Sequence, residues 1–442
     1  MTVDNNGYEQ AREIWNKAVP AKPGLIVECR TEEDVLRSIE FADRHDLAFS
    51  LRSGGHNIAG RGLLHNGMTL NLRHLNKMEV DHNFCRLHVG PGAILGDIDR
   101  LTSAHDLAVP LGVEPTTGAV GLTLGGGMGR LSCQYGLSCD SLVSARMVLA
   151  NGQVIDVSEN HYPEIFWAIR GGGGNFGVVT EMTFTLHPIP RTFIHGGIVY
   201  GKEKVIPALQ IYREILKQGD RKLGLDAALI VDHQGQKSIL FNVCFNGTRA
   251  EAEDSLRVLD SLGKPLSRRL IDKTYPEVQS SEHMPFGFYN YYQSSMTNAL
   301  QDELIEILAE ALNVVPVPDS EKSEFFIAFQ QMGTAISDQL PEATAFAHRD
   351  ALCNIIPISH TRSMTWHQKT KQCIDLIQEQ IAPYCSGFYT NDCNDTNCQN
   401  GEAFFHTNLP RLKLIKQQYD PDNLFNRSVD ISGCHQGLAA GR

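Results

Sequence analysis

Glycine is concentrated in three segments of the first 180 residues, and this feature limits the fold more than any other. The segments are Gly54-Gly55, Gly118 to Gly129, and Gly171 to Gly177. Because glycine has no Cβ, it adopts positive φ and lets backbone amides approach an anion closely. Successive amides of this kind can hold a diphosphate. Any one segment could serve only tight turns, but the three together favour a bound dinucleotide.

The first glycine turn follows a strand, a helix and a second strand. Leu25 to Val27 is a short apolar strand. Thr31 and Asp34 have the spacing of a capping box, which predicts a helix that begins there. Residues 48–51 are again strand-like and lead directly into Gly54. This α/β order exposes the backbone amides of the turn to a ligand.

The third glycine segment matches a dinucleotide motif but not its context. Gly172, Gly174 and Gly177 fit the pattern G-x-G-x-x-G. In a Rossmann fold this pattern follows an early strand and opens a helix. Here a strand-like run over residues 178–186 comes next. We therefore do not expect a Rossmann fold.

The composition changes near residue 192, after Pro188 and Pro190, and proline interrupts sheets. We expect a separate α+β domain over residues 193–385. Its predicted strands and helices alternate, with strands at 239–245, 325–330 and 352–358 and helices at 251–262, 302–312 and 367–381. Phe241, Val243 and Phe245 alternate as in a sheet with one buried face. Residues 386–442 are predicted to be loops that end in a mobile tail from residue 432.

Composition excludes several classes of function. Lys and Arg number 39 against 51 Asp and Glu, which gives a net charge of −12. Such a chain repels nucleic acids and acidic lipid surfaces. There is neither the basic start of a signal peptide nor a membrane-spanning run of about 18 apolar residues. We therefore expect a soluble cytoplasmic protein without nucleic-acid or membrane partners.

The cysteines favour free thiols. They number 11, an odd count, and include no C-x-x-C pair. Cys393 and Cys398 could bind a metal or form a cross-link, but no matching Cys or His pair lies near them in sequence. Cys133 and Cys139 are interpreted as structural thiols. We expect no metal site.

His56 is the strongest candidate for chemistry. It belongs to Arg52-Ser53-Gly54-Gly55-His56-Asn57, which sets an imidazole directly on a glycine turn. A histidine that only forms hydrogen bonds in a loop is the alternative. Further segments strengthen the chemical interpretation: Gly121 to Gly129, Tyr135 to Asp140, Phe166 to Glu181, and Tyr419 to Phe425.

Jointly these segments resemble flavoproteins of the vanillyl-alcohol oxidase and p-cresol methylhydroxylase superfamily, in the berberine bridge enzyme-like branch with 6-hydroxy-D-nicotine oxidase. The resemblance covers nearly the whole chain. It implies an α+β, two-domain, non-Rossmann FAD-binding fold of the p-cresol methylhydroxylase type, whose substrate domain is built on an antiparallel sheet. The FAD-binding domain would comprise residues 1–192 together with the returning segment 386–442, and the substrate domain residues 193–385.

The resemblance also implies where FAD binds. His56 would form the 8α-histidyl bond to the flavin. The cofactor-binding residues that it implies are Arg52, Ser53, Gly54, Gly55, His56, Asn57, Gly60, Thr116, Gly118, Gly121, Gly125, Gly126, Val178, Tyr389 and Asn391. A covalent link prevents loss of the cofactor, and an electron-withdrawing substituent on the ring makes it a stronger oxidant.

Glu114 and Thr117, which precede the long glycine segment, refine this expectation. Glu114 stands where many family members carry a cysteine that forms a second bond to the flavin, so we expect a single covalent link. Thr117 occupies the position that resembles the family's oxygen gatekeeper, where a compact β-branched residue leaves room for O2 and leucine obstructs it. An oxidase is therefore favoured over a dehydrogenase.

Thr117 and Tyr389 are the expected catalytic residues. Tyr389 begins a Tyr-x-Asn segment like that of the family, where the tyrosine can act as general base for an alcohol. A tyrosine that only packs on the flavin is the alternative. Asp392 departs from the tyrosine often found in the family at its position.

Residues 286–293 are rich in aromatic side chains. If they line the pocket, the substrate is aromatic or flat. The alternative is that these side chains pack in the core.

Taken together, these residues predict an FAD-dependent oxidase. It would transfer a hydride from a small organic alcohol or amine to covalently bound FAD and pass the electrons to O2, giving H2O2. A flavin dehydrogenase with another acceptor, or a non-redox flavoprotein cyclase in specialised metabolism, is the alternative. The sequence does not identify the substrate.

Overall fold

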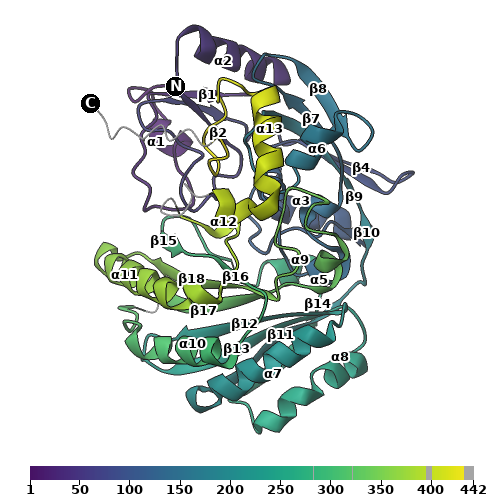
Figure 1. Ribbon diagram of the computed structural model, residues 1–442, viewed down its shortest axis with the longest axis vertical. Coiled ribbons are helices and arrows are strands. Elements are labelled where there is room, and N and C mark those ends of the chain that lie inside the picture. Colours follow the sequence, from purple (N-terminus) through teal and green to yellow (C-terminus); the bar gives the residue numbers. More distant parts are fainter. Residues whose placement is uncertain (282, 321, 395–400, 433–442) are drawn as a thin grey trace.

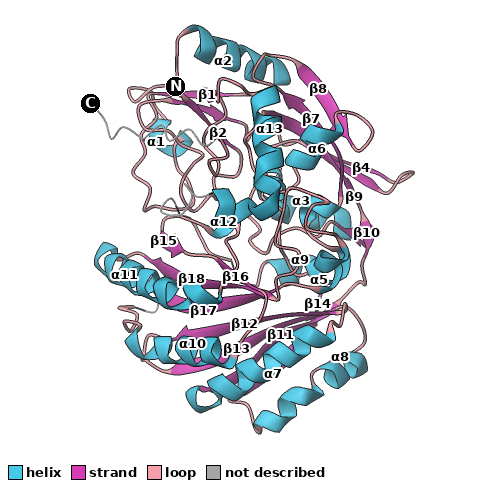
Figure 2. Ribbon diagram, in the orientation of Figure 1, coloured by secondary structure: helices cyan, strands magenta, loops and turns pink. Residues whose placement is uncertain are grey.

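Two structural units face each other in the molecule. The computed structural model describes residues 1–442 except 282, 321, 395–400 and 433–442. Figure 1 shows the purple N-terminal part and the yellow C-terminal segment in the upper unit, with the teal and green middle of the chain below. Helices and antiparallel sheets are both prominent (Figure 2), so the predicted α+β class is confirmed.

The upper unit contains two main sheets. One is parallel, in the order β1 (Leu25–Glu28), β3 (Met68–Asn71), β2 (Phe49–Arg52). The other is antiparallel, in the order β4 (Met78–Asp81), β5 (Arg86–Val89), β9 (Val178–Thr185), β7 (Leu142–Val148), β8 (Val154–Ser158). The strand predicted after Gly177 is therefore β9, and no helix opens there.

Short helices complete this unit. The predicted helix after Thr31 is α2 (Glu32–Arg44), and its capping box is present because the Asp34 N–H donates to Thr31 Oγ1 at 3.1 Å. The other helices are α1 (Tyr8–Ala11), α3 (Leu95–Ser103), α4 (Ala119–Leu124), α5 (Ser132–Tyr135) and α6 (Pro163–Ala168). A small pair of strands, β6 (Leu107–Ala108) and β10 (His187–Pro188), leads toward the lower unit.

The lower unit is built on an eight-stranded antiparallel sheet. Its order is β14 (Ser267–Lys273), β11 (Phe193–Gly201), β13 (Lys237–Phe245), β12 (Leu223–Val231), β17 (Glu324–Gln331), β18 (Cys353–Thr361), β15 (Tyr289–Tyr292), and β16 (Ser295–Thr297) also pairs with β18. The helices of this unit are α7 (Val205–Gln218), α8 (Arg249–Ser255), α9 (Tyr275–Gln279), α10 (Asp302–Val314) and α11 (Met364–Ile381).

The two faces of this sheet have different environments. Alternate residues of β12, such as Leu225 and Leu229, are buried in the core beneath α7, α10 and α11. Their neighbours Asp226, Ala228 and Ile230 point to the opposite face, as the two-residue period of a strand requires. That opposite face looks toward the upper unit in Figure 1.

The C-terminal segment corrects one prediction. Residues 386–442 were expected to form loops, but α12 (Gly401–Phe405) and α13 (Leu409–Tyr419) lie within them. Leu409, Leu412 and Ile415 bury one side of α13, where it packs against α6 of the upper unit. Only a few apolar residues mark this helix in sequence, and the turn-forming residues after it dominate the pattern. The tail predicted from residue 432 lies outside the described residues from 433 onward.

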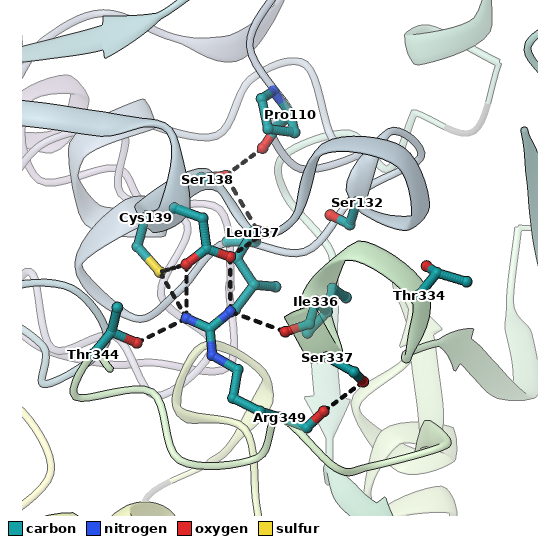
Figure 3. A network of polar contacts seen from close by, with 12 residues as sticks. Pro110, Ser132, Leu137, Ser138, Cys139, Thr334, Ile336, Ser337, Thr344 and Arg349 are labelled. Atoms are coloured by element: carbon teal, nitrogen blue, oxygen red, sulfur yellow. Dashed lines mark hydrogen bonds and ion pairs between the residues drawn. The ribbon is translucent and has the colours of Figure 1, made fainter. Parts of the chain in front are cut away.

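A buried ion pair joins the two units. Arg349 donates to both carboxylate oxygens of Asp140 at 2.7 Å, and it also donates to Thr344 Oγ1 at 2.7 Å (Figure 3). Both partners of the ion pair are almost fully buried. Cys139 lies beside them, and burial raises the pKa of its thiol, as expected for a structural cysteine.

We predict that Arg349→Met lowers the free energy of unfolding by about 3–5 kcal/mol, because it leaves the Asp140 charge buried without its cation. Arg221→Met is the matched control. Arg221 contacts Asp338 through the same two 2.7 Å hydrogen bonds, but both side chains are about half exposed. We expect it to cost at most about 1 kcal/mol. Urea unfolding of both variants tests this, and equal losses would contradict burial as the cause.

Candidate active site

A cavity of about 920 Å³ lies between the glycine-rich loops and the open face of the eight-stranded sheet. Residues of all three glycine segments line it, including Gly54, Gly121 and Gly174. Ala228 and Leu240 line it from the sheet. A large cavity with a mostly apolar wall and a few polar groups is the usual form of a cofactor or substrate site.

Two glycine loops touch through their backbones at the centre of this site. A Cβ on Gly54 would lie 2.4 Å from the Gly118 nitrogen, and a Cβ on Gly118 would lie 2.7 Å from the Gly54 nitrogen. Ser53 Oγ also donates a hydrogen bond to the Pro91 carbonyl. Because neither loop has room for a side chain here, glycine is required at both positions.

This contact brings His56 into a defined environment. Its ring stacks on Trp15 with centroids 5.3 Å apart, and Phe286 meets it edge-on at the same distance. Nε2 lies 2.7 Å from Thr116 Oγ1. Burial, with a smaller effect from His283, lowers the pKa of His56 to about 3. The imidazole is therefore neutral at ordinary pH.

Thr116 connects His56 to the carboxylate of Glu114. The sequence singled out this glutamate only because it stands where many family members carry a cysteine. The Thr116 hydroxyl donates to Glu114 Oε1 at 2.8 Å. His283 Nδ1 lies 2.8 Å from the same oxygen, and the Met284 N–H donates to Oε2 at 2.8 Å. The sequence shows Glu114 separated from two threonines by one proline, but it gives no signal for partners about 170 residues away.

Comparisons with known proteins agree with this geometry. Residues 23–158 match the FAD binding domain family, and residues 386–431 match the family described as berberine and berberine like. An FAD-linked oxidoreductase of Dictyostelium discoideum is 30% identical over 94% of this chain and 90% of its own length. The chain belongs to the berberine bridge enzyme-like family of FAD-linked oxidoreductases.

Other members extend the comparison. The (R)-6-hydroxynicotine oxidase of Paenarthrobacter nicotinovorans is 28% identical over 97% of this chain and 95% of its own. The crystal structure of 6-hydroxy-D-nicotine oxidase from Arthrobacter nicotinovorans has a TM-score of 0.89 at 26% identity, over 98% of this chain and 97% of that one. A glucooligosaccharide oxidase from Acremonium strictum shares the fold, with a TM-score of 0.87 at 22% identity over 97% of this chain and 96% of that one.

FAD is the cofactor of this berberine bridge enzyme-like protein, and the cavity fits it. A Cβ on Gly121 or Gly174 would meet no atom within 4 Å, so both glycines border open space. The arginines in the lining, Arg52, Arg61 and Arg427, all come from the upper unit. Positive charge and exposed glycine backbone on one side of the cavity suit a diphosphate.

Most of the predicted cofactor-binding residues meet at this cavity. Those that line it are Arg52, Ser53, Gly54, Gly55, His56, Asn57, Gly60, Gly118, Gly121, Gly125, Val178, Tyr389 and Asn391, together with Thr117. Thr116 lies behind His56 as described. Gly126 instead packs against Phe346, whose ring would lie 2.8 Å from a Cβ at that position. The assignment of these residues to FAD stays a prediction.

Tyr389 is buried, with its hydroxyl held by two donors. The Gly127 N–H donates to it at 2.9 Å and Asn391 Nδ2 at 2.7 Å. These hydrogen bonds lower the pKa of the phenol, but burial and the nearby Asp392 outweigh them, so the pKa is raised. The Tyr389 hydroxyl therefore keeps its proton at neutral pH.

Asp392 is a second titratable group that the sequence did not identify as functional. It lines the cavity and accepts a hydrogen bond from Asn354 Nδ2 at 3.4 Å. Burial raises the pKa of this carboxyl to about 7. Asp392 therefore changes its charge near neutral pH, whereas an exposed aspartate would stay ionised.

The aromatic-rich residues 286–293 divide between the cavity and the core. Tyr292 lines the cavity, and Phe286 packs on His56. The Tyr291 hydroxyl donates to Asp375 on the helix side at 2.6 Å. The segment therefore contributes both to the cavity wall and to packing outside it, and an aromatic or flat substrate stays a prediction.

Within the described residues, none of the helices combines the length and the apolar character that a membrane span needs. The same residues contain no group of three or more His, Cys, Asp or Glu side chains arranged around a possible metal ion. Cys393 is buried, while Cys398 lies outside the described residues.

We predict that Gly54→Ala and Gly121→Ala affect the protein differently. The new methyl at Gly54 collides with the Gly118 backbone, so we expect a loss of stability of about 1–3 kcal/mol, typical of overpacking, together with weaker FAD binding. The methyl at Gly121 meets no protein atom, so we expect weaker FAD binding without loss of stability in the FAD-free form. Thermal unfolding and FAD titration separate the effects. Equal stability losses would contradict the backbone contact.

Proposed function

We propose that this protein is an FAD-dependent oxidase that holds its FAD through a single covalent bond to His56. It oxidises a small organic amine or alcohol and passes the electrons to O2, giving H2O2. FAD supplies the two-electron acceptor for a hydride from the substrate. The observation that carries the proposal is the position of the His56 ring, which contacts Trp15 and Phe286 at the wall of a cavity suited to FAD.

The neutral state of His56 supports covalent attachment, because only an imidazole with a free lone pair is a nucleophile. Trp15 stacks on the ring and Phe286 contacts it edge-on, so the ring is already oriented before a cofactor binds. Glu114 occupies the position of the family's second attachment residue, and a carboxylate cannot form a thioether. A single link is therefore the form of attachment proposed.

The sheet side of the cavity supports a small organic substrate. Ile230, Leu240 and Phe326 provide an apolar wall, while Asn242 and Gln330 add polar groups. Apolar walls with a few placed polar groups bind small molecules with a preferred orientation. Tyr292 and Phe326 favour a flat or aromatic substrate, since aromatic rings pack well against each other.

The state of Tyr389 favours an amine over an alcohol. An alcohol needs a base to remove its hydroxyl proton, and the raised pKa of Tyr389 opposes that role. Asp392, whose pKa of about 7 lets it accept a proton, is a second candidate for the base. A neutral amine needs no such base, because its nitrogen lone pair assists the loss of hydride.

Thr117 supports O2 as the electron acceptor. It lines the cavity next to Gly118 and belongs to the turn that contacts Gly54. Its side chain is compact and β-branched, which leaves space that leucine would fill. A small opening at this position admits O2 to the reduced cofactor, whereas a larger side chain excludes it.

The proposal is tested by the colour of the protein. After acid precipitation we expect yellow flavin in the pellet, and with His56→Ala we expect it in the supernatant. Anaerobic mixing with a panel of amines and alcohols should bleach the flavin, and air should then restore the colour rapidly with formation of H2O2. Colour entirely in the wild-type supernatant would contradict covalent attachment. Slow return of the flavin colour in air would indicate a dehydrogenase. If a substrate is turned over but never bleaches the flavin, the protein is a non-redox enzyme.

We predict that Thr117→Leu slows reoxidation by O2 by about tenfold or more, which corresponds to about 1.4 kcal/mol in the barrier. Anaerobic reduction by substrate should change much less. Thr117→Val is the matched control, because it keeps the β-branched shape and should reoxidise at nearly the wild-type rate. Stopped-flow spectroscopy measures both half-reactions. If leucine and valine reoxidise equally fast, Thr117 does not control access of O2.

A further inference from the structure

Glu114, Thr116 and His56 form a chain of hydrogen bonds that ends at exposed His283. Nε2 of His56 is 2.7 Å from Thr116 Oγ1, and that hydroxyl is 2.8 Å from Glu114 Oε1. His283 Nδ1 is 2.8 Å from the same carboxylate oxygen, and its side chain is 42% exposed. The Glu114 side chain is only 13% exposed. The chain therefore leads from the cavity wall to solvent.

The direction of these hydrogen bonds fixes the position of the proton on His56. Thr116 has one hydroxyl proton, and it is donated to the Glu114 carboxylate. The threonine oxygen must then accept a proton from His56 Nε2. The reverse order would leave two oxygens 2.8 Å apart with no proton between them. The neutral imidazole therefore carries its proton on Nε2, and its lone pair is on Nδ1.

We propose that Glu114 and Thr116 are positioning residues for covalent attachment of FAD. They present the lone pair of Nδ1 for bond formation and remove the proton from Nε2 as the bond forms. This inference rests on the proposed covalent link to His56. It assigns a role to the glutamate that replaces the family's second attachment residue.

The chemical balance requires a proton acceptor at this place. Attachment breaks a C–H bond of the flavin 8α-methyl group and forms a bond from that carbon to Nδ1. The two electrons of the C–H bond would pass to the flavin ring and then to O2, and the C–H proton together with the proton lost from Nε2 would balance the two protons of H2O2. After Nδ1 has bonded to carbon, the imidazole would be cationic unless Nε2 loses its proton. The low pKa of His56 shows that this environment disfavours a cation.

The arrangement supplies the path for that proton. Nε2 passes its proton to Thr116 Oγ1 while the threonine hydroxyl passes its own to Glu114. Glu114 then holds that proton at a point where the exposed His283 connects the site to solvent. The Met284 N–H holds the other carboxylate oxygen at 2.8 Å and so keeps Glu114 in place.

The test is the rate of covalent attachment. The full chain, purified from cells grown with limiting riboflavin, is incubated with FAD in air, and flavin retained by acid-precipitated protein is measured over time. We expect Thr116→Val and Glu114→Gln to lower the rate at saturating FAD by at least about tenfold, a threshold below the roughly 10²–10⁴-fold that a positioned proton acceptor typically contributes. Thr116→Ser is the matched control, since it keeps the hydroxyl and should remain within about twofold of wild type.

A double variant distinguishes a relay from independent effects. If both residues act in series, Thr116→Val with Glu114→Gln should be no slower than the slower single variant, because the first substitution already breaks the path. Effects that multiply would overturn the relay. Non-covalent FAD binding, followed by fluorescence, shows that each variant is folded and sets the saturating concentration.

The remaining outcomes are equally decisive. Variants that attach FAD at the wild-type rate would overturn the inference. The inference would also be overturned if the variants raise only the FAD concentration that gives half the maximal attachment rate, since that change reflects binding alone. If the wild-type protein never retains flavin on acid precipitation, the proposed covalent link to His56 fails instead, and the failure is distinguishable from failure of the relay.

Discussion

The backbone contact between Gly54 and Gly118 is the constraint on which the site depends. Two loops approach so closely there that a Cβ on either residue would collide with the other loop. Their contact places His56 and Thr116, 60 residues apart in the chain, within hydrogen-bonding distance. Residues of both loops, among them Gly54 and Gly118, also line the wall of the cavity. Close packing and access for a cofactor thus come from the same absence of side chains.

The buried ion pair supports the opposite wall of the site. Asp140 and Arg349 fix the short turn that contains Ser138, whose backbone N–H donates to the Gly127 carbonyl at 2.9 Å. The Gly127 N–H in turn donates to the Tyr389 hydroxyl at 2.9 Å. A salt bridge far from solvent is costly unless it is fully satisfied. Here Arg349 donates to both oxygens of Asp140 through Nη1 and Nη2, whereas its buried Nε has no hydrogen-bond partner among the described residues, so the pair is largely but not fully satisfied.

Local patterns predicted much of the fold, whereas long-range contacts decided the parts that were missed. The capping box of Thr31 and Asp34 involves neighbours three residues apart, so the sequence displays it directly. The helix Leu409–Tyr419 depends on packing against a distant helix and was predicted as a loop. Likewise, Glu114 finds His283 across 169 residues of chain. No pattern along one chain encodes that meeting, because the fold of both units creates it.

The chemistry of Glu114 follows from the donors around it. A carboxylate can accept several hydrogen bonds, and here Thr116, His283 and Met284 all contact it. A thiol in its place would accept weakly and leave some of these donors without a strong partner. Glu114 also connects the turn beside His56 to the segment that leads into β15 of the lower unit. If His56 is the single point of attachment, the charge and tautomer of that imidazole determine whether the cofactor is retained. A glutamate that orders the imidazole therefore bears directly on whether that single bond forms.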